Sequence, residues 1–197
     1  MNRHTRTFEP EGPHESLMTD DEFMTFIERR PEHERWQLID GVPFCMNPAT
    51  NRHQRLCLRL ANLLNDGVEA KRPGLIALTE RGLLMPGVRR FRPVANVAVV
   101  VDDDGGSYTE SFYLAAEILS PSNTEEHIER KRLRYMQHPG NLCVLVISQD
   151  VVRVEVWLRS SGWAMREATS LRHVVSVPEL GVRFDLKSLY RGTPLAR

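Results

Sequence analysis

Apolar residues recur along the chain at two spacings, one typical of helices and one typical of strands. A short helix is predicted to begin at Thr19–Glu22, which has the residue types and spacing of a capping box. A longer amphipathic helix is predicted to begin at Thr50 or Asn51. Its apolar stripe consists of leucines four residues apart: Leu56, Leu60 and Leu64. Residues 1–17 have no apolar periodicity and are predicted to form a flexible tail.

Strands are predicted on both sides of this long helix. Residues 36–39 and 42–46 flank Asp40-Gly41, a dipeptide typical of a two-residue hairpin turn. Residues 75–78 and 82–85 are predicted as two further short strands, because three polar residues separate them.

The second half of the chain predicts a strand–helix–strand unit. An apolar strand over residues 113–119 is followed by a helix over 125–136 and by a second apolar strand over 142–147. Two such strands joined by a helix are expected to be parallel, with a right-handed crossover. The β-branched run 96–101 predicts a further strand, buried on both faces.

The remaining segments complete a single α/β domain. Residues 151–158 and 162–167 predict a hairpin, and residues 182–190 predict a short strand followed by a helical turn. We therefore expect one domain over 18–192 with a mixed sheet, and a short C-terminal tail over 193–197.

Composition narrows the class of protein. The chain has 197 residues, of which 41% are hydrophobic, and 26 basic side chains balance 26 acidic ones. No apolar run approaches the roughly 20 residues of a membrane-spanning helix, and no secretory leader is visible, so a cytoplasmic protein without membrane contact is expected. The cysteines lack metal-site spacing and are predicted to be buried in a reducing compartment: Cys45, Cys57 and Cys143.

Glu117 stands out because it is the only charged residue in the apolar strand 113–119. Burying a carboxylate is costly unless it is protonated, paired or bound to a cation. Ligands of open α/β sheets gather beyond the carboxyl ends of strands, where Glu117 is predicted to lie. The position indicates either a metal ligand or general base, or a carboxylate paired with Arg or Lys for structural reasons.

Lys131 is the predicted partner of Glu117. It follows Ile128 by three residues and precedes Tyr135 by four, so it lies at the margin of the helix face that is expected to contact the sheet. In a phosphodiester reaction such a lysine would stabilise developing negative charge. The alternative is a lysine whose ammonium extends into solvent.

Two histidines and a serine are weaker candidates. His53 opens the leucine-rich helix, where a substrate-binding or acid–base role competes with a capping or surface role. His127 lies one turn before Lys131 and is either a weak metal ligand or a solvated residue. Ser120 lacks the G-x-S-x-G context of a serine hydrolase. A hydrolase built on His53, His127 and Glu117 is therefore the most distant alternative.

From about Met18 to Gly192 the chain resembles the Uma-type restriction endonuclease family, which has the PD-(D/E)XK restriction-endonuclease-like fold. Single blocks are weak, but their order and spacing together are fairly specific. The resemblance rests on these blocks: 18–23, 38–41, 47–49 leading to His53, 117–122 followed by Lys131 and Tyr135, 178–181, and 189–190. It implies an α/β fold with a restriction-endonuclease-like mixed sheet, flanking helices and a βαβ crossover.

The resemblance also implies a metal site and residue roles. Glu117 would be a ligand of Mg²⁺ or Mn²⁺, Lys131 would be the catalytic lysine, and Asn96 stands where the family carries a metal-binding Asp. Gln37 and His53 would position substrate, together with Tyr135.

Three positions depart from the family pattern by losing an acid: Gln37, Asn96 and His127. Mg²⁺ prefers anionic oxygen ligands, and an amide oxygen brings no charge. The sequence therefore predicts a damaged metal site.

We expect a Mg²⁺-dependent DNA endonuclease-like protein, built for phosphodiester hydrolysis, with a degenerate metal site. The alternative is a non-catalytic binding or scaffold protein, conceivably a homodimer, that retains the nuclease fold. A neutral chain has no global attraction for DNA. Such residues are more often simply solvated, but the candidate phosphate contacts are Arg52, Arg55, Arg59, Arg89, Arg90 and Arg92.

Overall fold

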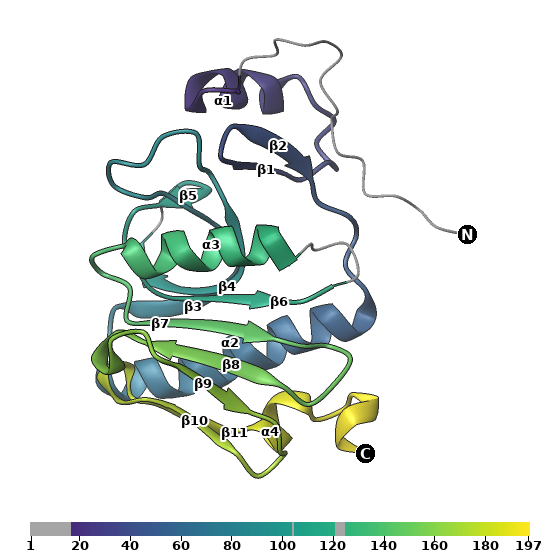
Figure 1. The fold of residues 1–197 in the computed structure, drawn as a ribbon, viewed down its shortest axis with the longest axis vertical. Helices are drawn as coiled ribbons and strands as arrows, with labels where there is room; N and C mark the ends of the chain where they lie inside the picture. The colour runs from purple at the N-terminus through teal and green to yellow at the C-terminus, as the bar shows by residue number, and fades with distance from the viewer. Residues whose placement is uncertain (1–16, 104, 121–124) are drawn as a thin grey trace.

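A computed structural model describes residues 17–103, 105–120 and 125–197. The predicted N-terminal tail therefore lies almost entirely outside the described residues. The helices of Figure 1 are α1 (Asp20–Glu28), α2 (Asn51–Lys71), α3 (Glu125–Gln137) and α4 (Leu186–Tyr190). The strands are β1 (Trp36–Ile39), β2 (Val42–Cys45), β3 (Leu75–Leu83), β4 (Val94–Val101), β5 (Tyr108–Thr109), β6 (Phe112–Ile118), β7 (Cys143–Ile147), β8 (Val154–Leu158), β9 (Met165–Ala168), β10 (Val174–Val177) and β11 (Val182–Asp185).

A seven-stranded mixed sheet forms the centre of the protein, with the strand order β5-β3-β4-β6-β7-β8-β9. Strands β6 and β7 are parallel and are joined through α3, which confirms the predicted βαβ unit. Their neighbours β4 and β8 run antiparallel to them. The sheet is therefore mixed, as the sequence predicts.

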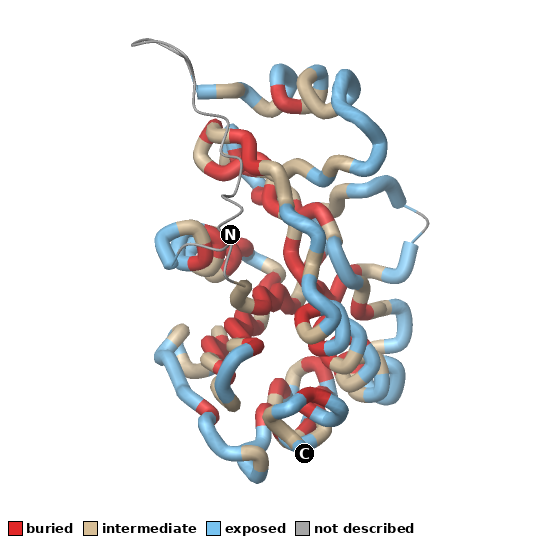
Figure 2. The backbone as a smooth tube through the Cα atoms, turned by 90° about the vertical axis from the view of Figure 1, so that its right-hand side faces the viewer, coloured by how far each residue is buried: buried red, intermediate tan, exposed pale blue. Residues whose placement is uncertain are grey.

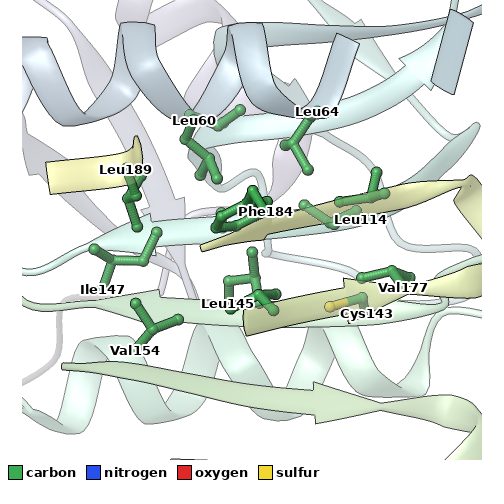
Figure 3. Packing of buried hydrophobic residues seen from close by; sticks show 14 of the residues in the cluster. Leu60, Leu64, Leu114, Cys143, Leu145, Ile147, Val154, Val177, Phe184 and Leu189 are labelled. Carbon is green, nitrogen blue, oxygen red and sulfur yellow. The ribbon is translucent and has the colours of Figure 1, made fainter. Parts of the chain in front are cut away.

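Helices cover both faces of this sheet, because alternate residues of each central strand point to opposite sides (Figure 1). On one face, the leucine stripe of α2 packs against Val97 and Leu114, together with the β10–β11 hairpin and α4 (Figure 3). On the other face, Ile128 and Tyr135 of α3 pack against residues such as Ala115. The central strands are accordingly buried, as Figure 2 shows.

Local sequence signals account for the element boundaries. Thr19 and Glu22 form a complete capping box at the start of α1. Of the two predicted caps of α2, Thr50 is the one used, since its hydroxyl accepts from the backbone N–H of His53. Asp40 and Gly41 both have positive φ, as the β1–β2 turn requires.

The structure corrects the prediction of two strands over 75–78 and 82–85. A single strand, β3, spans Leu75–Leu83 and pairs with β4 on both sides of the polar residues 79–81. Glu80 has a φ of 51°, so the strand is locally deformed there without ending. The deformed part of the strand carries the polar residues 79–81, and in the sequence these look like a break between two strands.

Two further features were not anticipated. Strand β10 pairs with β11 as a separate two-stranded sheet. The residues after Gly192, assigned to a tail from the sequence, contain the 3₁₀ turn Pro194–Ala196, and Thr193 before it is buried. Among the described residues, no helix combines the length and apolar character that crossing a membrane requires.

Candidate active site

Glu117, Lys131 and Tyr135 form a buried cluster between the sheet and α3. Glu117 lies next to the last residue of β6 and is 1% exposed, while Lys131 is 4% exposed. The ammonium of Lys131 lies 2.7 Å from Glu117 Oε1, and the Tyr135 hydroxyl donates to the same oxygen at 2.9 Å. The predicted approach of Lys131 to Glu117 is therefore confirmed, and the solvent-exposed alternative for Lys131 is wrong.

Burial sets the proton affinities in this cluster. Burial raises the pKa of Glu117, and the charge and hydrogen bonds of Lys131, followed by the Tyr135 hydroxyl, counteract that rise. Burial and the nearby carboxylate raise the pKa of Tyr135 well above its ordinary value, so its hydroxyl remains a donor. The carboxylate is thus held by two donors and has little exposure to water.

The backbone of Val94, the first residue of β4, connects Lys131 to Gln37. The ammonium of Lys131 donates to the Val94 carbonyl at 2.8 Å. The Val94 N–H donates to Gln37 Oε1 at 3.3 Å, so the amide side chain of β1 is bonded to the backbone of β4. Gln37 is thus connected to Lys131 only through the backbone of Val94. Its side-chain oxygen serves to hold β1 against β4.

Asn96 and His53 form a neighbouring pair on the α2 side. The backbone N–H of Ile118 donates to Asn96 Oδ1 at 2.7 Å. His53 hydrogen-bonds to the Asn96 side chain and to the backbone of Ile118, and its burial lowers its pKa. The register Val97↔Ala116 extends to place Asn96 opposite Glu117, but the Asn96 oxygen is occupied by the backbone of β6.

His127 lies next to the cluster and contacts an aromatic ring. Its imidazole packs edge-on against Phe44 of β2, with ring centroids 4.1 Å apart. Partial burial lowers the pKa of His127; the charge of Glu126 opposes this shift, and the charges of Arg130 and Lys131 add to it. A neutral imidazole therefore stands where the family pattern has an acid.

These residues do not fit a resident Mg²⁺. In the described part of the chain, no three His, Cys, Asp or Glu side chains are grouped as a metal site. Glu117 is paired with a lysine cation, and the oxygens of Asn96 and Gln37 accept backbone N–H groups. Mg²⁺ binds through hard anionic oxygens, and the second carboxylate that would attract it is missing.

Comparisons with known proteins identify the family and the fold. The sequence profile of the Uma2 family, described as "Putative restriction endonuclease", matches residues 20–187. The chain belongs to this family. A solved structure described as "a putative nuclease belonging to DUF820", from Anabaena variabilis, has a TM-score of 0.71 and 18% identity to this Uma2 protein, covering 88% of this chain and 97% of that chain. The expected nuclease fold is confirmed; a search of curated proteins finds no match.

Glu80 is a residue near this Uma2 site that the sequence did not single out. The pairs Thr79↔Val97 and Arg81↔Ala95 place it opposite Asn96 on the neighbouring strand. Its charge counteracts the lowered pKa of His53. The available signal is a carboxylate with apolar strand residues on both sides, but the sequence prediction places Glu80 between two separate strands.

Proposed function

We propose that this Uma2 protein is an endonuclease-like protein with a degenerate metal site. Phosphodiester hydrolysis of DNA is the chemistry for which its fold is suited, and Mg²⁺ or Mn²⁺ is the ion that such a reaction would use. The observation that carries the proposal is the uncharged amide of Asn96, whose oxygen accepts the Ile118 N–H at the position where the family resemblance implies a metal-binding Asp.

Charge counting supports this proposal. Glu117 contributes one negative charge, and Lys131 at 2.7 Å contributes one positive charge, so the pair is neutral. Gln37 and Asn96 add amide oxygens without charge, and His127 adds a neutral imidazole. A divalent cation would therefore lose hydration in exchange for little electrostatic attraction.

In this arrangement Lys131 has a positioning role. Its ammonium is divided between Glu117 and the Val94 carbonyl, and Tyr135 donates to the same carboxylate. Such a lysine holds the ends of β4 and β6 against α3. Stabilising charge on a phosphate would require the lysine to leave these partners.

The test is metal binding and plasmid cleavage by the wild type, Asn96→Asp, and Asn96→Asp with Gln37→Glu. We expect no Mg²⁺- or Mn²⁺-dependent cleavage by the wild type, and a gain of Mn²⁺ affinity of about tenfold or more when the carboxylates return. Mn²⁺ binding is measured by titration calorimetry. Asn62→Asp, an exposed exchange on α2, is the matched control.

Two outcomes contradict the proposal. One is metal-dependent cleavage by the wild type that disappears in Glu117→Ala and Lys131→Ala. The other is an Asn96→Asp protein that is folded, as judged by circular dichroism, and binds Mn²⁺ no better than the Asn62→Asp control.

A non-catalytic binding or scaffold role is the second candidate. The equal numbers of basic and acidic residues favour it, as do the internal contacts of several arginines that the sequence offered to phosphate. Arg52 contacts Asp150 at 3.0 Å, and Arg92 contacts Asp20 at 3.3 Å. A scaffold of this kind, as a monomer or as a homodimer, is expected to show no salt-dependent binding of DNA.

A further inference from the structure

A cavity of about 400 Å³ lies between α2 and α4, at a distance in the fold from the cluster of Glu117 and Lys131. Its walls come from the outer side of α2, from α4 and from Arg191, which directly follows α4. The volume is within the range of sites that bind small molecules. Most of the lining side chains are polar or charged, so we examined which of them already have partners.

Contacts behind the cavity hold its walls in place. Leu60 on α2 and Leu189 on α4 belong to the same core cluster (Figure 3). Asn65 accepts the Ala77 N–H at 2.6 Å through Oδ1, and its Nδ2 donates to the Ala77 carbonyl at 3.3 Å, which fixes α2 to β3. The cavity is therefore preformed, and a ligand would not have to order the protein in order to bind.

Two arginines form one end of the cavity. Arg59 belongs to α2, and Arg191 is kept near it because the next residue, Gly192, accepts a hydrogen bond from Arg55, one turn before Arg59. Within the described ranges, neither Arg59 nor Arg191 makes an ion pair or a hydrogen bond with another residue. A guanidinium group binds a phosphate through two parallel hydrogen bonds, so this end is suited to an anion.

Asp66 provides an acceptor at the other end. It follows Arg59 by seven residues, which places it on the same side of α2 and about 10 Å further along the helix axis. The amide of Asn62 and the hydroxyl of Ser188 line the wall, and neither has a side-chain hydrogen bond to a described residue. The cavity thus combines two positive charges at one end with a single carboxylate at the other.

We propose that this cavity binds a small phosphate monoester that carries hydroxyl groups, such as a pentose phosphate. The phosphate lies between Arg59 and Arg191, and the hydroxyl groups donate to Asp66. A dicarboxylate would bring a second negative charge to Asp66, and an uncharged sugar would leave both guanidinium groups without an anion. The inference does not rest on the proposed function, because it uses none of the residues of the candidate active site.

The full-length protein labelled with ¹⁵N is titrated with ribose 5-phosphate, with ribose and with inorganic phosphate, and amide resonances are followed by NMR. We expect ribose 5-phosphate to shift the amides of Asn62 and Ser188 with a dissociation constant of about 1 mM or lower. Ribose and inorganic phosphate should each bind more weakly. Arg59→Ala and Arg191→Ala should each lower the affinity for ribose 5-phosphate about tenfold or more.

Asp66→Ala separates the two ends of the cavity. It should weaken binding of ribose 5-phosphate about threefold or more, while inorganic phosphate binds at least as well as before, because a negative charge has been removed. Two exposed residues outside the cavity serve as matched controls: Arg183→Ala on β11 and Glu69→Ala on α2 should leave both affinities unchanged. The amide spectra also establish that each variant is folded.

Three outcomes overturn the proposal. The first is an absence of shifts at Asn62 and Ser188, which would leave the cavity a solvated groove. The second is equal affinity for inorganic phosphate and ribose 5-phosphate, since Asp66 would then take no part. The third is a shift of the same amides by duplex DNA but not by ribose 5-phosphate, which would assign the two arginines to phosphate diesters.

Discussion

At the scale of single residues, the buried carboxylate of Glu117 is the group whose pairing most affects the stability of the site. A carboxylate with 1% exposure depends on the donors around it, and here these are Lys131 and Tyr135 on one helix. Removing one member of such a pair leaves a buried charge without compensation, whereas removing both leaves a polar but neutral space. The cluster can therefore be tested by stability measurements that require no enzymatic activity.

Lys131→Met is expected to lower the free energy of unfolding by about 3–5 kcal/mol, because Glu117 is left buried without its cation. The double variant Lys131→Met with Glu117→Gln should recover a substantial part of this loss. Urea denaturation of the two variants and the wild type measures both effects. Equal stability of Lys131→Met and the wild type would mean that the pair does not stabilise the fold.

The stability deficit of Lys131→Met is expected to increase with pH. Burial already raises the pKa of Glu117, and removing Lys131 removes the largest opposing influence. A folded-state pKa above the unfolded value gives stability that is present at acidic pH and is lost as pH rises through the folded value. Denaturation at pH 5 and pH 8 should therefore give the larger deficit at pH 8. A deficit independent of pH would contradict a buried, titrating carboxylate.

Sequence reasoning reached the Glu117–Lys131 pair because an acid in an apolar strand needs a partner, and one crossover helix provides few. It did not reach the orientation of Asn96, because a side chain that bonds to the backbone of Ile118 depends on how β4 pairs with β6. The same applies to Glu80, which approaches His53 only through the pairing of β3 with β4. The orientation of Asn96 and the position of Glu80 both depend on the pairing of strands that are distant in the sequence, and so the sequence alone did not predict them.

At the scale of elements, the position of α2 depends on its close approach to β11. A Cβ atom built on Gly67 would lie 2.8 Å from the Cα of Val182 and 3.0 Å from the Gly181 carbonyl oxygen. Backbone atoms cannot move aside as a flexible side chain can. The absence of a side chain at Gly67 therefore allows the helix to pack directly against the hairpin.

Gly67→Ala is expected to destabilise the protein by about 1–3 kcal/mol through overpacking. Helix propensity alone would predict a gain of about 1 kcal/mol, so the sign of the change separates the two effects. Thermal denaturation measures it, with the exposed substitution Glu69→Ala on the same helix as a control. A rise in Tm for Gly67→Ala would show that β11 can shift to accommodate the added methyl group and that helix propensity outweighs overpacking.

Element prediction succeeded where the pattern was long and failed where a strand was interrupted. The helix α2 and the βαβ unit have continuous periodicity, and both were predicted from the sequence. Strand β3 was divided in two because residues 79–81 are polar, although pairing with β4 continues past them. Strand β10 is four residues long, too short for alternation to distinguish it from a loop.

At the scale of the whole molecule, the balance of charges provides no global attraction for DNA. The 26 basic and 26 acidic side chains leave no net charge. Arg52 and Arg92 contact acids, and Arg55 donates to the Gly192 carbonyl oxygen. Among the arginines proposed for phosphate, Arg89 and Arg90 are exposed at the loop before β4.

Duplex DNA is expected to bind weakly, with a slope of log K against log salt of about −2, since each phosphate contact contributes about −0.9. Arg89→Ala with Arg90→Ala should bring the slope close to zero. Arg166→Ala, at an exposed position on the edge strand β9, should leave it unchanged. Fluorescence anisotropy at several salt concentrations measures these slopes. A slope of about −6 or steeper would require a phosphate-binding surface beyond these two arginines.

The bonds of Lys131 have a consequence for how relatives of this protein are compared. One ammonium joins α3 to the Val94 carbonyl of β4 and to Glu117 of β6, so it ties together three elements of the fold. Selection for a stable domain would preserve both residues even after hydrolysis had been lost. On the function proposed above, a carboxylate at position 96 would therefore be a better sign of a working metal site in a relative than a retained acid–lysine pair.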